Sequence, residues 1–289
     1  MRSSLRLLGH AGNCLLTALI ATAASAGERL TATGGVTQVE GSAGGGLVPW
    51  AVIAGYGTRN EVGASAFLTR LETQGFRLDS AGVAVGIKDR LELSLARHRF
   101  NLGDTAPGES IDQDVVGIKL KLSGDAVFDQ DNPWPQVSAG LQHKRNRDFN
   151  RVPKLLGAKH DTGTDYYLSA TKLYLAGFAG RNVLLNATLR ATKANQLGLL
   201  GFGGDLKDRY QLEGEVSAVL LLTDNFAIGT EYRQKPNNLS VYRENDFRDL
   251  FAAWYLRKEI SITAGYVKLG NVANKPDQHG LYVSLQGAF

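Results

Sequence analysis

The chain has 289 residues, of which 32 are Lys or Arg and 28 are Asp or Glu, and it contains one cysteine, Cys14. This near balance of charge lacks the basic excess of a nucleic-acid-binding protein, and a single cysteine excludes a disulfide scaffold. Glycine is frequent (34 residues) and proline is rare (7), whereas a disordered secreted linker is rich in both.

Residues 1–26 have the pattern of a secretory signal peptide. Arg2 and Arg6 precede an apolar run that ends in Ala24-Ser25-Ala26, a typical cleavage site. Cleavage before Gly27 removes these two arginines and no acidic residue, which leaves 30 Lys and Arg against 28 acidic residues. The mature chain, residues 27–289, has no apolar run of about 18 residues. If it enters a membrane, it does so as a β-barrel.

From Leu30 onward, segments of about ten residues with alternating polarity are separated by Gly, Asn, Asp and Pro clusters. This spacing is typical of barrel strands. We therefore predict an all-β fold, a transmembrane antiparallel up-and-down β-barrel of about 14 strands. The predicted strands are Leu30 to Val39, Leu47 to Gly57, Glu61 to Leu71, Leu78 to Ile87, Leu91 to Leu102, Ile111 to Leu122, Gln136 to Arg147, Asp165 to Leu175, Asn182 to Lys193, Arg209 to Leu222, Phe226 to Lys235, Phe247 to Leu256, Ile260 to Leu269 and Gly280 to Phe289.

The glycine-rich stretch Gly41 to Gly46 weakens the first predicted hairpin. Residues 27–46 could instead lie in the lumen as a plug segment, which would leave a barrel of twelve strands. The sequence leaves both arrangements open.

The connections alternate between short and long in the second half of the chain, as they do between the periplasmic and outer ends of bacterial barrels. Two connections depart from this pattern. Ser123 to Pro135 is long but falls on the predicted periplasmic side, where it could be a small plug or docking element. Glu72 to Gly75 is short but falls outside.

Aromatic residues and the last strand favour a membrane. Tyr166, Tyr167 and Tyr210 fall at predicted outer strand ends, and Phe226, Trp254 and Phe289 at inner ends, which resembles the aromatic girdles of such barrels. The last strand places apolar residues at alternate positions and ends on an aromatic residue, as expected of a C-terminal assembly signal read by the barrel-assembly machinery. The residues of this predicted signal are Leu281, Val283, Leu285 and Phe289, and Gly287 does not fit the pattern.

The positions between the lipid-facing residues should line the lumen. Pairing Leu222 with Phe226 across the turn places Glu215 opposite Arg233 and puts Glu231 opposite Ser217. A similar count places Arg190 near Glu213. The candidate lumen polar cluster is therefore Arg190, Glu213, Glu215, Glu231 and Arg233. Such a cluster orients a solute, or it consists of wall charges that pair to avoid burial alone.

These patterns predict a narrow pore or binding channel for a small solute in the bacterial outer membrane, in contact with its lipid and acting as a monomer. The alternative is a closed structural or interaction barrel that presents its loops to partners. A hydrolase is a remote alternative, because His98, His143, His160 and His279 fall near outer strand ends but no nucleophile motif accompanies them. We expect no enzymatic activity, no metal site and no cofactor.

Two stretches carry a family resemblance. TATGGVTQVEGSAGGGLVPWAVIAGYG, from Thr31 to Gly57, and PWPQVSAG, from Pro133 to Gly140, resemble an uncharacterised proteobacterial family known as a domain of unknown function. The resemblance covers nearly all of the mature chain and implies a Gram-negative envelope protein. It supplies no activity and no functional residues.

Overall fold

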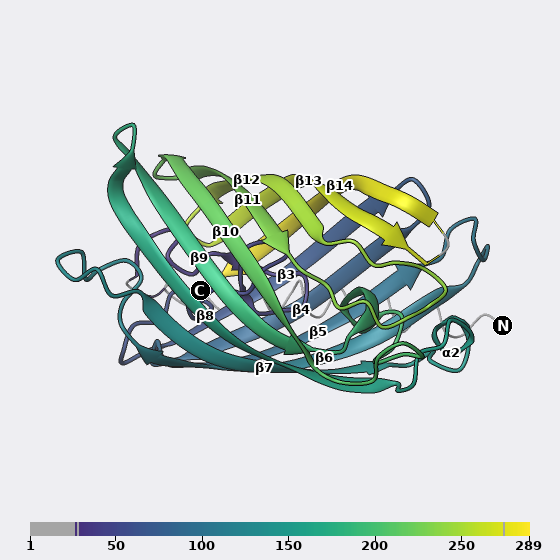
Figure 1. Cartoon of the computed structure of the whole chain (residues 1–289). Coiled ribbons are helices and arrows are strands. Elements are labelled where there is room, and N and C mark those ends of the chain that lie inside the picture. The colour runs from purple at the N-terminus through teal and green to yellow at the C-terminus, as the bar shows by residue number, and fades with distance from the viewer. Residues whose placement is uncertain (1–26, 28, 274) are drawn as a thin grey trace, which may run out of the picture.

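A computed structural model describes residues 27, 29–273 and 275–289, so the predicted signal peptide lies outside the described residues. Within them, twelve long strands form one closed antiparallel barrel in which sequence neighbours pair and β14 pairs with β3 (Figure 1). The wall consists of β3 (Val62–Thr73), β4 (Arg77–Ile87), β5 (Leu91–Asn101), β6 (Ser110–Ser123), β7 (Gln136–Asn146), β8 (Thr162–Phe178), β9 (Arg181–Thr192), β10 (Gln211–Thr223), β11 (Phe226–Arg233), β12 (Phe247–Arg257), β13 (Ile260–Val272) and β14 (Lys275–Ala288).

The predicted all-β barrel is confirmed, and of the two arrangements the structure has twelve strands plus a luminal N-terminal segment. The first two predicted strands, Leu30 to Val39 and Leu47 to Gly57, are not part of the wall. Residues 29–57 contain only one small hairpin, of β1 (Val36–Thr37) and β2 (Ala43–Gly44), which lies inside the barrel (Figure 1). A wall strand must expose one of its faces to lipid, whereas nearly every residue of these two segments is buried.

The outward face of the wall is an apolar belt. Leu185, Leu189 and Val216 are each about half exposed, while their sequence neighbours Asn186, Thr188 and Ser217 are buried in the lumen. A closed barrel with such a belt satisfies its backbone internally and presents hydrocarbon to lipid, which is how an outer-membrane protein spans its bilayer. No helix among the described residues is long and apolar enough to cross a membrane.

The two ends of the barrel differ. We call the end that carries Phe289 the inner end, because barrels of this kind place their short turns in the periplasm. Most turns there are short, such as residues 179–180, 224–225 and 258–259. The outer end carries the longer connections, residues 147–161 with the short helix α2 (Val152–Leu155), 193–210 with the 3₁₀ turn η1 (Asn195–Gly198), and 234–246. The two departures noted in the sequence, the long inner connection and the short outer one, are both present.

The last strand closes the barrel. Leu281, Val283 and Leu285 face outward with 66%, 53% and 46% of their surface exposed. The backbone N–H of Phe289 donates to the Ala64 carbonyl at 2.8 Å, and the Phe289 carbonyl accepts from Ala64 N–H at 2.9 Å. The alternation is therefore present in the structure, and its use as an assembly signal stays a prediction.

Of the aromatic residues, Tyr166 and Tyr210 lie outward at the outer end with ring centroids 6.0 Å apart. Trp254 lies outward near the inner end. Tyr167 differs from the prediction, because its side chain points into the lumen and is buried. It follows Tyr166 directly, and successive side chains of a strand point to opposite faces.

Candidate functional site

The lumen is occupied by the N-terminal segment, residues 29–57, which we call the plug. Every residue from Thr33 to Gly57 except Gly46 is buried. The plug has little secondary structure of its own, so wall side chains satisfy much of its backbone. For example, Ala51 N–H donates to Thr171 Oγ1 at 2.7 Å, and the Ala51 carbonyl accepts from Gln136 and Ser138 at 2.6 Å each.

A closed ring of six charged side chains ties the plug to one side of the wall. In order around the ring, each joined to the next by an ion pair, these are Lys144, Glu40, Arg233, Glu215, Arg190 and Asp165. The ring has three cations and three anions, and every member is at least 96% buried. Complete pairing is what allows these charges to remain inside the barrel.

Glu40 is the ring member supplied by the plug. It accepts from Arg233 Nη1 at 2.7 Å and also pairs with Lys144. Burial alone would raise the pKa of its carboxyl, but the charges of Arg233, Lys144 and Arg190 outweigh burial and lower the pKa well below its usual range. Glu40 is therefore a carboxylate at neutral pH, and the ring is electrically balanced.

The structure brings together three of the five predicted cluster residues. Glu215 faces Arg233 and Ser217 faces Glu231 in the β10–β11 register, as the turn geometry predicts, and Arg190, Glu215 and Arg233 share the ring. Glu231 stands beside it and accepts from Leu47 N–H of the plug at 2.6 Å and from Ser217 at 2.7 Å. Glu213 lies opposite Arg190 in the β9–β10 register, but it is half exposed and is not a ring member.

A second buried pair holds the inner part of the plug. Glu92 and Lys119 lie 3.1 Å apart and are 1% exposed. Glu92 accepts from the backbone N–H groups of Ala43 and Ala54, and Lys119 donates to the carbonyls of Ala43 and Val52. The pair thus acts as both acceptor and donor for backbone groups of the plug.

His98 lies near the outer end of β5, as expected, and its side chain points into the lumen with no exposed surface. Its Nε2 lies 2.9 Å from the carbonyl of Val39, and neighbouring Ser80 donates to the same carbonyl at 2.7 Å. A serine beside a histidine could suggest a hydrolase, but here both groups hold the plug. His143, His160 and His279 are exposed and interact with Thr164, Asp208 and Gln74.

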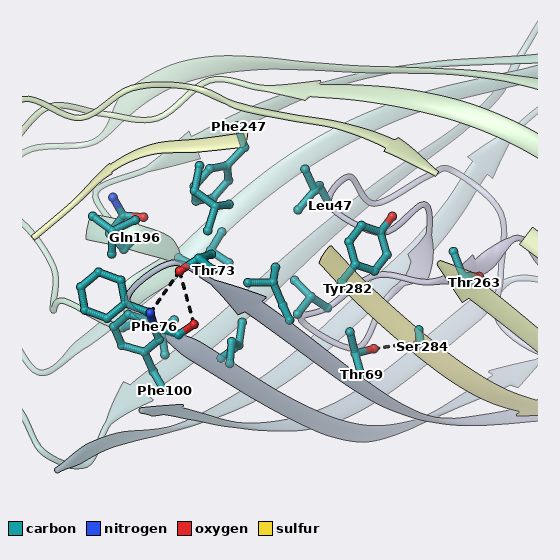
Figure 2. A pocket seen from close by; sticks show the side chains of 18 of the residues that line it. Leu47, Thr69, Thr73, Phe76, Phe100, Gln196, Phe247, Thr263, Tyr282 and Ser284 are labelled. Atoms are coloured by element: carbon teal, nitrogen blue, oxygen red, sulfur yellow. Dashed lines mark hydrogen bonds between the residues drawn. The ribbon is translucent and has the colours of Figure 1, made fainter. Parts of the chain in front are cut away.

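Open space remains beside the plug at both ends. The outer cavity, about 60 Å³, lies between the plug, the outer halves of β3–β5 and β12–β14, and η1 (Figure 2). Its surface is almost entirely apolar, with Phe76 and Phe100 stacked at 5.1 Å. The polar groups at its edge are paired within the protein, as Thr69 is with Ser284 (Figure 2).

The inner chamber is larger, about 800 Å³, and lies between the plug and the inner halves of β8–β12. Leu173, Leu184, Val219 and Phe251 line it from four strands, and Trp50 lines it from the plug. Val36 of the β1–β2 hairpin lines both spaces, so the hairpin separates them.

A family model described as a protein of unknown function, DUF3034, matches residues 33–286. The chain belongs to this family. A search of curated proteins finds no match. The DUF3034 chain is similar to solved outer-membrane barrels: the KdgM porin (10% identity, TM-score 0.48, covering 78% of this chain and 99% of the porin), the NanC porin (11%, 0.48, 78% and 98%) and Omp33 of Acinetobacter baumannii (10%, 0.45, 80% and 100%). These identities are too low to carry a solute to this chain.

Sequence reasoning missed half of the ring in this DUF3034 protein. Glu40, Lys144 and Asp165 were not in the predicted cluster, nor were Glu92 and Lys119. Four of these five are wall residues that alternate along their strands with outward-facing neighbours. The alternation that identified Glu215 could therefore have identified them. These four are Glu92, Lys119, Lys144 and Asp165. Glu40 carried no such signal, because it lies in a segment without strand periodicity.

Proposed function

We propose that the protein is an outer-membrane channel that binds a small solute in its lumen and passes it when the plug moves. The supporting observation is the uneven filling of the lumen. Ion pairs hold the plug against the β7–β11 side, while the space left directly beside the plug is about 800 Å³ toward the inner end and about 60 Å³ toward the outer end. Protein interiors are normally close-packed, so a barrel that served only as a scaffold would gain nothing from a space of this size.

The plug is the element that must move. It separates the two spaces at Val36, and it is held by hydrogen bonds and ion pairs to the wall. In the seated position shown in Figure 1 the plug runs inside the barrel, so the seated state is the closed state of the channel.

A disulfide lock tests this proposal. The mature chain has no cysteine, since the only one is Cys14. Ala51 N lies 2.7 Å from Thr171 Oγ1, so these two residues are in direct contact, and Ala51→Cys with Thr171→Cys is the pair chosen to join the plug to β8. In planar bilayers the oxidised protein should be silent, and reduction should restore channel steps. Equal conductance in both states would show that the plug is not the gate.

The closed interaction barrel is the second candidate, and the complete pairing of the charge ring favours it. It would present residues 148–164, residues 236–246 and the Pro133-Trp134-Pro135 turn, where Trp134 is 56% exposed. Silence from correctly folded protein in both redox states, and also after the ring is broken at Glu40, would favour this candidate over the channel.

A further inference from the structure

We infer that the inner chamber is a binding site for an uncharged, water-insoluble small molecule, such as an aromatic or short aliphatic hydrocarbon. The inference rests on the proposed function, because it names the class of solute that the channel would take.

The size and lining of the chamber support this class. A volume of about 800 Å³ lies within the range of about 300–1,000 Å³ that small-molecule sites occupy. The deep part of the lining consists of aliphatic and aromatic side chains from four wall strands, together with the indole of Trp50. The indole N–H already donates to Ser217 at 2.9 Å, so the part of Trp50 left for a ligand is its apolar ring.

Polar lining groups lie mainly at the mouth of the chamber. Asp224, Asn225 and Lys258 come from the turns at the inner end of the barrel, and Arg257 is the last residue of β12 beside them. Lys258 is engaged with the Gly27 carbonyl and lies 5.4 Å from the Tyr56 ring. A charged or sugar-like solute that moved past this mouth would lose water without gaining partners, which is costly. An apolar solute gains from the same step.

The outer cavity selects the same chemistry. Thr73 at its edge is paired with Gln278, Gln196 with Glu244, and Tyr282 with Asp249. With these polar groups engaged, the surface that remains is apolar (Figure 2). The two spaces on either side of Val36 therefore form one apolar route that the β1–β2 hairpin interrupts.

The unusually long inner connection belongs to the same site. Residues 124–135 lie along the end of β8, where Lys172 donates to the carbonyls of Asp125 and Asp129. This position brings Val127 and Phe128 to the chamber. Phe128 is 55% exposed, and an exposed aromatic ring at the mouth provides an apolar first contact for a solute of this class.

Fluorescence quenching tests the inference with bromobenzene as the probe and the whole mature chain in amphipol. The reporter protein carries Trp134→Phe and Trp254→Phe, so that Trp50 is its one tryptophan. Because Trp50 lines the chamber, bromobenzene should quench it saturably, and bromide ion should not. A second protein that keeps only Trp254, on the lipid-facing surface, should show quenching that rises linearly as the probe partitions.

Two substitutions on β12 provide the matched comparison. Ala253 is buried and lines the chamber, and Ala252 is its half-exposed neighbour on the opposite face. Ala253→Phe should weaken the saturable quenching at least tenfold, and Ala252→Phe should leave it unchanged. Heat-modifiable gel migration verifies that each variant has folded.

The outcomes separate the inference from the proposed function. Linear quenching of Trp50, or equal saturation in Ala253→Phe and Ala252→Phe, overturns the apolar site. If channel steps of the disulfide-lock protein still depend on reduction, only the solute class is wrong and the channel stands. If quenching is saturable and blocked by Ala253→Phe but the unlocked protein is silent, the site stands and the passage function fails.

Discussion

Breaking the charge ring at Glu40 should release the plug. In Glu40→Gln, Lys144 and Arg233 lose the carboxylate that the plug supplies, although Lys144 keeps Asp165 at 2.6 Å and Arg233 keeps Glu215 at 3.2 Å. Removing one partner of a buried pair costs about 3–5 kcal/mol. Because each cation retains one anion, we expect the free energy that favours the seated plug to fall by about 3 kcal/mol, the lower end of this range. That is about a hundredfold increase in the unseated population, since about 1.4 kcal/mol corresponds to tenfold.

Single-channel recording measures this change as open probability. The control is Glu213→Gln. Glu213 lies in the same region of β10, but its carboxylate is half exposed and is not part of the ring. We expect the open probability of Glu40→Gln to rise by about two orders of magnitude and that of Glu213→Gln to stay at the level of the unaltered protein. An equal effect of the two substitutions would refute the claim that the ring seats the plug.

Three further expectations concern the same elements. The pKa of Glu40 is held well below its usual range, so its contribution to seating is fully present above the ordinary pKa and is lost only as pH falls through the lowered value. The ratio of open probability between Glu40→Gln and the unaltered protein should therefore stay constant from about pH 8 to about pH 5, and a ratio that falls toward one near pH 6 would contradict this. Glu244→Gln leaves buried Lys235 without its carboxylate partner at 2.8 Å, and the loss of about 3–5 kcal/mol of local stability should accelerate hydrogen exchange in residues 234–246. The control Glu109→Gln breaks an exposed ion pair with Arg151 and should change hydrogen exchange little. Leu185→Arg on the lipid-facing belt should lower the free energy of unfolding by about 2–4 kcal/mol in a denaturant titration in lipid, whereas Leu206→Arg in an exposed loop should be neutral.

The barrel wall could be predicted because its strands obey a physical rule that the sequence displays. Lipid on one side and a polar lumen on the other require alternation, and every strand from β3 to β14 overlaps a predicted one. The Glu215–Arg233 register was equally accessible, because a short turn between Leu222 and Phe226 fixes which residues face each other.

The plug could not be assigned with the same certainty, because its position depends on contacts across the lumen. Leu30 to Val39 and Leu47 to Gly57 alternate in polarity enough to suggest strands, yet both faces are buried. Glu40 meets Lys144 and Arg233 only because three distant segments converge. Local periodicity carries no information about such an encounter.

The plug needs glycine at some positions because its backbone lies very close to side chains of the wall. A Cβ atom on Gly45 would lie 2.0 Å from Glu231 Oε1, and one on Gly46 would lie 2.6 Å from the Tyr282 hydroxyl oxygen. The stretch Gly41 to Gly46 therefore serves close approach of backbone to the lumen wall, where its sequence suggested only a weak hairpin.

Hydrogen bonds and ion pairs to the wall are contacts that a moving plug can exchange for contacts with water. The apolar side chains that the plug buries, Val48 and Ile53 among them, would lose their burial when the plug left, at about 25 cal/mol per Å² exposed to water. A hydrogen bond to the wall contributes only about 0.5–1.5 kcal/mol net, because water replaces it. The carboxylates of Glu92 and Glu231, which now bind plug N–H groups, would be hydrated in an open lumen, and the ring cations would keep their wall partners. The polar contacts thus fix the position of the seated plug, its buried apolar side chains add to the free energy needed to displace it, and the apolar spaces beside it are left for the solute.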